Sequence, residues 1–191
     1  MATKSKSQLK DVFNGPSSLL YMSNPLTITE SEGVKTFSNV TPELDVPCKV
    51  DSLEFEQGES EIQEYNVIGL NGAWVSDNEP GDINLSFRVP SIHEDVLKLA
   101  FGEDAVASIS GAVDSVEYEG LALTLKDKKV EGTWMIMNKA KNRLMILNNT
   151  ALYASLKLDQ DVKGVAAVDF NGTLESDGTN PDVIFLKKKA S

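Results

Sequence analysis

Residues 83–102 constrain the fold more than any other stretch, because they predict a strand that runs directly into a helix. Apolar side chains alternate with polar ones along residues 83–89, and the apolar set is Ile83, Leu85, Phe87 and Val89. This period of two is typical of a strand with one face in a core and one face in water. Pro90 ends the strand, because proline has no N–H group to donate to a sheet. A strand of this kind needs an apolar layer over its inner face.

The following residues predict a helix near residues 92–101. Ser91 and Glu94 have the spacing of a capping box, in which two side chains satisfy free N–H groups at the helix start. One helical face collects Ile92, Val96, Leu97, Ala100 and Phe101. Gly102 stands where glycine commonly closes a helix. We therefore expect a helix of about three turns whose apolar stripe lies against a sheet.

Nearly all of the remaining chain reads as short strands and loops. Strands are expected at residues 19–22, 49–57, 65–68, 113–118, 121–125, 130–138, 143–147, 152–158, 166–174 and 183–186. A hairpin turn is expected at residues 126–129, and Asn148-Asn149 is expected to break the chain between two strands. The pattern predicts a mainly β fold, an antiparallel β-sandwich or barrel with one flanking helix and long loops.

The expected organisation is an N-terminal arm at residues 1–47, partly irregular, followed by one domain at residues 48–191. Residues 24–46 hold several prolines and glycines and predict either a surface loop or a segment that packs on a neighbouring subunit. A second long loop is expected at residues 69–81, where Trp74 either packs beneath the loop or contacts a partner.

The composition and motifs indicate no catalytic, metal-binding or nucleic-acid-binding site. The net charge is −11, which argues against a surface that grips nucleic acid. Cys48 is the single cysteine, and His93, the single histidine, has no nucleophile or metal-ligand motif near it in sequence. The first ten residues do not resemble a signal peptide, and no apolar run is long enough to span a membrane. We expect no catalytic residues, no cofactor, no metal site and no membrane contact, and hence a protein that is not an enzyme.

Two expected strands are apolar on both faces. Residues 134–137 and 144–147 would each leave an apolar face uncovered in a simple two-layer fold. The missing layer is the helix, the arm or a neighbouring chain. On the last alternative, the side chains expected at a subunit interface are Met135, Met137, Met145 and Leu147, with Trp74 from the loop.

The order and spacing of these elements resemble the tail tube (major tail) proteins of long-tailed bacteriophages. The resemblance rests on Leu53-Glu-Phe-Glu-Gln-Gly58, on Tyr65-Asn-Val-Ile-Gly69, on the strand and helix from Asp82 to Gly102, and on the strands after Leu121. It implies a structural protein of the virion, a homo-oligomer of hexameric rings that stack into a tube. It further implies contact with other tail proteins, passage of DNA without specific binding, assembly in the host cytoplasm, and final location in the virion tail. Type VI secretion tube proteins share the fold and are an alternative.

The acidic balance adds a hypothesis about the inside of such a tube. A wall of carboxylates repels a DNA duplex and keeps it from adhering. The residues expected to line the lumen are Glu54, Glu56, Glu59, Glu61 and Glu64. The alternative for these residues is an outer surface that only aids solubility. The alternative for the whole chain is a carbohydrate- or protein-binding β-sandwich module with exposed aromatic side chains such as Tyr65, Trp74 and Tyr118.

Overall fold

The chain, in a computed structural model, is mainly β, with antiparallel curled strands and one flanking α-helix, as the sequence predicts. The structure describes residues 13, 15–38, 40–66, 68, 73–79, 81–159, 165–176 and 178–189. The side chains of residues 50, 61, 63, 65, 66, 73–79 and 159 are outside this description. The first ten residues lie outside this description.

The main sheet has eight strands, and all of its pairs are antiparallel. Along its path the strands are β4 (Leu44–Val46), β1 (Pro16–Met22), β11 (Lys129–Asn138), β12 (Arg143–Asp159), β13 (Val165–Leu174), β8 (Ile83–Val89) and β5 (Glu54–Gln57), while β14 (Val183–Lys187) pairs with β12. A short 3₁₀ helix, η1 (Val50–Ser52), precedes β5 and shortens the strand expected at residues 49–57. The sheet therefore includes strands from both sides of the expected boundary at residue 47.

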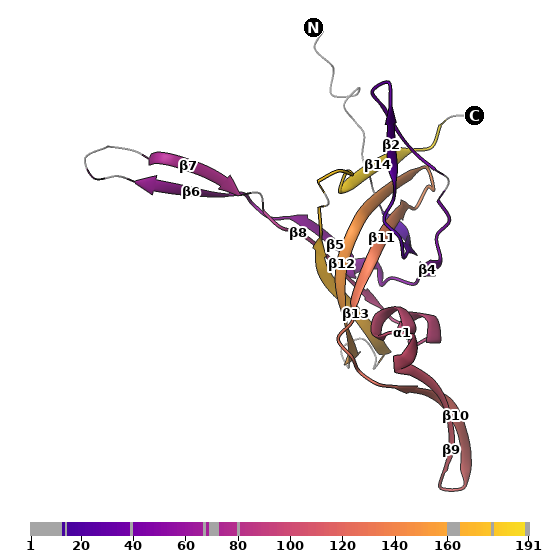
Figure 1. Cartoon of the computed structure of the whole chain (residues 1–191). Coiled ribbons are helices and arrows are strands. Elements are labelled where there is room, and N and C mark those ends of the chain that lie inside the picture. The colour runs from indigo at the N-terminus through magenta and orange to yellow at the C-terminus, as the bar shows by residue number, and fades with distance from the viewer. Residues whose placement is uncertain are drawn as a thin grey trace.

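Three two-stranded hairpins stand outside the main sheet. They are β2–β3 (Ile28–Ser31 and Val34–Phe37), β6–β7 (Glu61–Asn66 and Ala73–Glu79) and β9–β10 (Val106–Val113 and Val116–Leu123). The hairpins β6–β7 and β9–β10 project from the body of the molecule (Figure 1). The expectation of a long loop at residues 69–81 is thus wrong for residues 73–79, which form a strand. Within the arm expected to be partly irregular, residues 28–31 and 34–37 form a hairpin.

The helix α1 (Glu94–Phe101) covers one face of the sheet and is shorter than predicted. The Ser91 hydroxyl accepts a hydrogen bond from the His93 amide (3.2 Å), so Ser91 belongs to a tight turn before the helix. His93 caps the helix instead, because its Nδ1 accepts from the Asp95 amide (3.4 Å). Ile92, predicted on the apolar face, is exposed for the same reason. At the other end, Lys128 donates from Nζ to two last-turn carbonyls.

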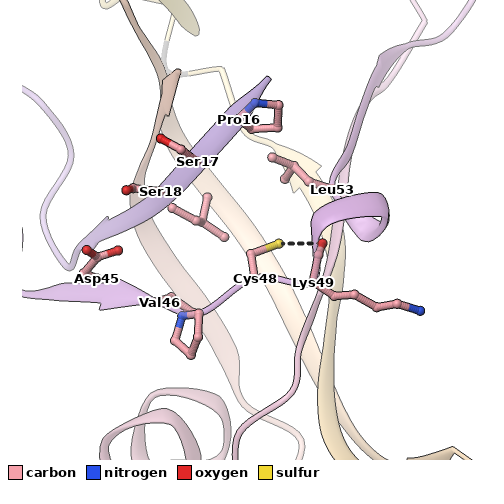
Figure 2. A pocket seen from close by; sticks show the side chains of 10 residues that line it. Pro16, Ser17, Ser18, Asp45, Val46, Cys48, Lys49 and Leu53 are labelled. Carbon is pink, nitrogen blue, oxygen red and sulfur yellow. Dashed lines mark hydrogen bonds between the residues drawn. The ribbon is translucent and has the colours of Figure 1, made fainter. Parts of the chain in front are cut away.

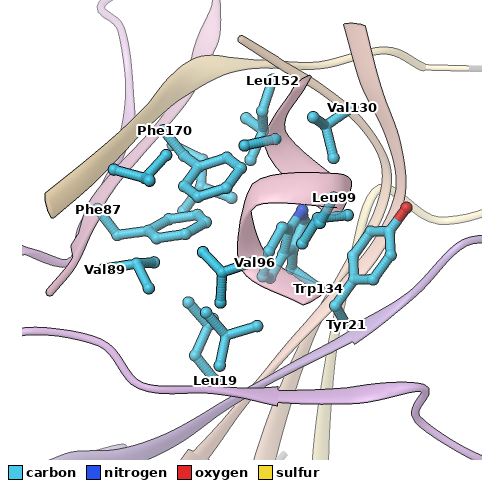
Figure 3. Close-up of a cluster of buried hydrophobic side chains, with 14 of the residues drawn as sticks. Leu19, Tyr21, Phe87, Val89, Val96, Leu99, Val130, Trp134, Leu152 and Phe170 are labelled. Carbon is cyan, nitrogen blue, oxygen red and sulfur yellow. The ribbon is translucent and has the colours of Figure 1, made fainter. Parts of the chain in front are cut away.

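The main core lies between α1 and the sheet and is built around Trp134. The Trp134 ring packs against Phe87, Phe170 and Tyr21, with ring centroids 4.7, 6.0 and 4.9 Å away, and Figure 3 shows Val96 and Leu99 of α1 beside it. These aromatic side chains come from four different strands, β11, β8, β13 and β1. Their burial joins the alternating apolar faces that the sequence predicts into one core.

Strand β12 is continuous where the sequence predicts a break. It pairs with β11 along most of its length, with β14 over residues 143–147 and with β13 over residues 150–159. Asn149 has a φ of +52°, which asparagine tolerates better than most residues. Asn148-Asn149 thus marks a bulge where β12 exchanges one partner for another, and the chain does not turn there.

The second apolar face of β11 and β12 is covered by the chain's own N-terminal segment. Leu26 is buried together with Met135 and Ile146, and Ile28 and Val40 pack at the margin of this small cluster. Buried Asn148 holds the segment in place: its Oδ1 accepts from the Leu26 amide (2.7 Å), and its Nδ2 donates to the Leu26 carbonyl (3.4 Å). The sequence left three candidates for the layer over this face: the helix, the arm or a neighbouring chain. In the structure the arm covers it.

Candidate assembly surfaces

The hairpin β9–β10 is a ribbon of two paired strands that projects from one end of the main sheet. Its strands pair residue by residue from Val106–Leu123 at the base to Val113–Val116 at the tip. The turn residues Asp114 and Ser115 have φ values of +49° and +66°, the requirement for the tightest hairpin turn. The strand expected across this turn, at residues 113–118, and the hairpin turn expected at residues 126–129 are therefore wrong. The alternation of residues 106–113 before Asp114 could have predicted the first strand of this hairpin and its turn.

One face of the ribbon carries only apolar side chains and glycines. The face consists of Ala107, Ile109, Gly111, Val113, Val116, Tyr118, Gly120 and Ala122. Its four large side chains, Ile109, Val113, Val116 and Tyr118, are 56%, 63%, 53% and 58% exposed. A Cβ added at either glycine would meet nothing within 4 Å, so the face is open as well as flat. Within the described chain, nothing covers it.

The opposite face of the ribbon is polar and acidic. It carries Ser108, Ser110, Glu117 and Glu119, with Leu121 nearer the base. Residues 106–123 contain the carboxylates of Asp114, Glu117 and Glu119 and no lysine or arginine. The ribbon therefore has two chemically distinct faces, and its base, at Val106, is anchored in the main core.

A basic cluster lies at the other end of the main sheet. The turn between β11 and β12 contributes Lys139, Lys141 and Arg143, and the C-terminal segment contributes Lys187, Lys188 and Lys189. The two segments are held together because Arg143 pairs with Lys187 in the sheet and the Lys188 amide donates to the Asn142 carbonyl (2.9 Å). All five lysines are exposed. We call these six residues the basic end.

The outer face of strands β5, β8, β13 and β12 is a broad polar surface. Arg88 and Lys157 both contact Asp169, at 2.6 and 2.9 Å, and the Arg88 guanidinium holds the pKa of that carboxyl below its ordinary value. Glu54 and Glu56 lie on this face, opposite Ser86 and Asn84 of β8. We call it the polar sheet face.

The structure divides the five glutamates predicted for a lumen. Glu54 and Glu56 share the polar sheet face, Glu59 lies in the connection after β5, and Glu61 and Glu64 belong to β6 in the projecting hairpin. The side chain of Glu61 lies outside the described set. These five residues therefore do not form one surface within a single chain.

The side chains predicted for a subunit interface are mostly inside the chain. Met145 and Leu147 are buried in the main core, and Met135 is buried beneath the N-terminal segment. Met137 is partly buried, and the side chain of Trp74 lies outside the described set. As the chain is folded, Met135, Met145 and Leu147 are not available to a neighbour, because its own helix and arm supply the layers that cover them.

A hollow of about 250 Å³ lies between β1, β4 and η1 (Figure 2). Cys48 lines it, and its Sγ donates weakly to the Lys49 carbonyl (3.5 Å). Burial raises the pKa of the Cys48 thiol, which makes the thiolate scarce at neutral pH. His93 could in principle act as a base, but it is the N-cap of α1 and does not line this pocket.

No group of three or more His, Cys, Asp or Glu side chains in the described part of the chain is placed to hold a metal ion. No helix there is both long and apolar enough to cross a membrane. The surfaces with the clearest chemistry are therefore the ribbon, the basic end and the polar sheet face.

Comparison of the sequence with protein-family models and with curated proteins finds no match.

Proposed function

We propose that this chain is a structural subunit that assembles with copies of itself into stacked rings, forming a tail tube through which DNA passes. The resemblance in sequence order to tail tube proteins suggests hexameric rings. The observation that carries the proposal is the uncovered apolar face of the ribbon β9–β10.

An isolated two-stranded hairpin is marginally stable in water, and exposed contiguous apolar patches mark protein contacts. In the described chain, β9 pairs only with β10, so the ribbon also offers unpaired backbone groups along both outer edges. A second copy that covers the apolar face and pairs with an edge would satisfy both needs. This contact replaces the one expected from the sequence, because the two-faced strands are already covered.

The polar sheet face supports the second part of the proposal, the passage of DNA. Arg88 and Lys157 on this face both contact the carboxylate of Asp169, and Lys129 of the adjacent strand β11 contacts both Glu131 (2.9 Å) and Glu175 (2.7 Å). Paired cations are poorly placed to bind phosphates, whereas Glu54 and Glu56 repel them. A lumen lined by this face would let a duplex pass without gripping it.

A matched pair of substitutions tests the assembly surface. Ile109 on the ribbon and Ile92 before α1 are equally exposed, at 56% and 57%. Ile109→Asn would place an amide in the proposed contact, where burial without a hydrogen-bond partner costs roughly 1–3 kcal/mol. We expect the concentration needed for assembly, measured by sedimentation and negative-stain microscopy, to rise about tenfold or more, since 1.4 kcal/mol is a factor of ten. Ile92→Asn should leave assembly unchanged.

The result that overturns the proposal is a wild-type protein that remains monomeric at every concentration tested. A monomer that also binds a glycan or peptide through the ribbon face, with binding lost in Ile109→Asn, would favour the binding-module alternative. Tyr118 is the observation behind that alternative, because it is an exposed aromatic side chain on the same face.

A further inference from the structure

Two groups of charged side chains that form no ion pair within the described chain lie at opposite ends of the main sheet. Many lysines of the body are paired, for example Lys98 with Glu94, Lys126 with Asp104 and Lys157 with Asp169. Among the residues that the structure describes, none of the five lysines of the basic end forms an ion pair. The charges of these five lysines are therefore not balanced by ion pairs within the described chain.

The carboxylates of the ribbon have no partner either. Asp114, Glu117 and Glu119 make no ion pair within the described chain. Since residues 106–123 hold no cation, the ribbon carries three formal negative charges over its whole length.

The two surfaces face away from each other along the sheet. Strand β11 starts at Lys129, close in sequence to the base of the ribbon, and ends at Asn138, next to the basic end. In Figure 1 the ribbon β9–β10 and strand β14, which ends at Lys187, lie at opposite ends of the molecule. Within one chain the acidic ribbon therefore cannot meet the basic end, whereas in two copies placed head to tail it can.

We infer that the acidic face and tip of the ribbon of one copy bind the basic end of a second copy. This inference rests on the proposed function, and it names the chemistry and direction of one contact in the assembly. Glu117 and Glu119 lie on the opposite face from Ile109 and Tyr118, so a ribbon can bind a basic end while its apolar face is covered by another copy. The same ribbon thus takes part in two different contacts.

The geometry of this contact determines the kind of assembly. A contact between two different surfaces, repeated in one direction, adds copies without limit unless the rotation closes it into a ring. A ribbon that joins neighbours side by side through one face and end to end through the other supplies both directions of growth that a stack of rings requires.

Salt provides the first test, because both surfaces are exposed. The Debye length is about 8 Å at physiological ionic strength and about 3 Å at 1 M, so contacts between exposed charges weaken as salt is added. We expect wild-type assemblies to shorten or dissociate between about 0.1 and 1 M NaCl, whereas contacts made by the apolar face should persist.

Charge exchange provides the decisive test. Glu117→Lys with Glu119→Lys makes the ribbon basic. Changing Lys139, Lys141, Lys187 and Lys188 together to glutamate leaves two positive and four negative charges and so reverses the basic end. Each variant alone would oppose like charges, and we expect at least a tenfold loss of assembled protein in sedimentation. An equimolar mixture of the two variants restores opposite charges at every contact and should recover assembly. Glu54→Lys with Glu56→Lys changes the net charge as the ribbon variant does and should assemble normally.

The outcomes separate this inference from the proposed function. If wild type assembles and both the ribbon variant and the basic-end variant assemble equally well, or if each fails and the mixture does not recover, the head-to-tail contact is wrong while the tube proposal stands. If wild type never assembles, the proposed function itself fails. If a short DNA duplex binds the basic end and stays bound in wild-type assemblies, the basic end is not covered by a second copy, which also overturns the inference. Circular dichroism of each variant confirms that the fold is retained.

Discussion

Asn148 offers the sharpest test of how the N-terminal segment is held on the sheet. Its side chain is buried, and its Oδ1 accepts from the Leu26 amide at 2.7 Å and from the Thr133 hydroxyl at 3.1 Å. Its Nδ2 donates to the Leu26 carbonyl at 3.4 Å. Asn148→Ala therefore removes the side chain that satisfies both backbone groups of Leu26, while the Thr133 hydroxyl keeps its bond to the Asn24 carbonyl.

The magnitude follows from these contacts. A buried donor or acceptor left without its partner costs roughly 1–3 kcal/mol, so two such groups predict a loss of about 3 kcal/mol. For a chain of this size 1 kcal/mol shifts Tm by roughly 2–4 °C, which predicts a decrease of about 6–12 °C. The loss should appear in urea unfolding as a lower midpoint with an unchanged slope.

Proteolysis shows where the loss occurs. Lys35 lies in β3, within the segment that Asn148 anchors, so trypsin should cleave after Lys35 faster in Asn148→Ala than in wild type. Asn171→Ala is the control, because Asn171 is an exposed asparagine on the polar sheet face, and its change should stay within about 0.5 kcal/mol. A loss below about 1 kcal/mol in Asn148→Ala, or a full loss with unchanged cleavage after Lys35, would refute this account of the anchor.

Two further predictions concern pH. Because the pKa of Asp169 is lowered in the folded chain, first by its hydrogen bond to Arg88, its stabilisation is present above the unfolded pKa near 3.9 and is lost as pH falls through the folded value. Asp169→Asn should flatten the acid limb of stability measured below about pH 4, and an unchanged limb would contradict the assignment. Burial raises the pKa of Tyr21 to about 12, so stability should fall as pH rises from about 10 to 12, by up to about 3 kcal/mol. Tyr21→Phe should remove this decrease in stability at alkaline pH. At neutral pH the variant should lose the hydrogen bond that the Tyr21 hydroxyl donates to the Glu131 carbonyl (2.7 Å). Unfolding measured from about pH 8 to pH 12 in both proteins would detect the difference.

Local pattern alone determined the strands with one apolar face and one polar face. Residues 83–89 and 166–174 alternate strictly enough to predict β8 and β13 and which of their large apolar side chains enter the core. The helix was predictable for a similar reason, since its apolar stripe has the helical period. The capping residue was not, because the choice between Ser91 and His93 depends on a turn geometry that several sequences share.

Partner choice was decided only by the tertiary structure, because it depends on residues far apart in the chain. The sequence shows that β11 and the first half of β12 are apolar on both faces, but periodicity carries no information on what covers a face. Leu26 reaches that face through a hydrogen bond to a residue 122 positions away, and only the folded chain brings the two together. For the same reason the sequence predicted Met135, Met145 and Leu147 at a subunit interface, whereas they are buried inside the folded chain.

The ribbon shows the complementary case. Its two strands are local in sequence, and Asp114-Ser115 forms the turn, yet only the tertiary structure decides that no other strand of the described chain pairs with it. An alternating hairpin has the same pattern whether its apolar face lies in a core or in water. The sequence alone thus determined that the chain is a β protein with one flanking helix. The tertiary structure decided which apolar faces the described chain covers and that the apolar face of the ribbon stays open.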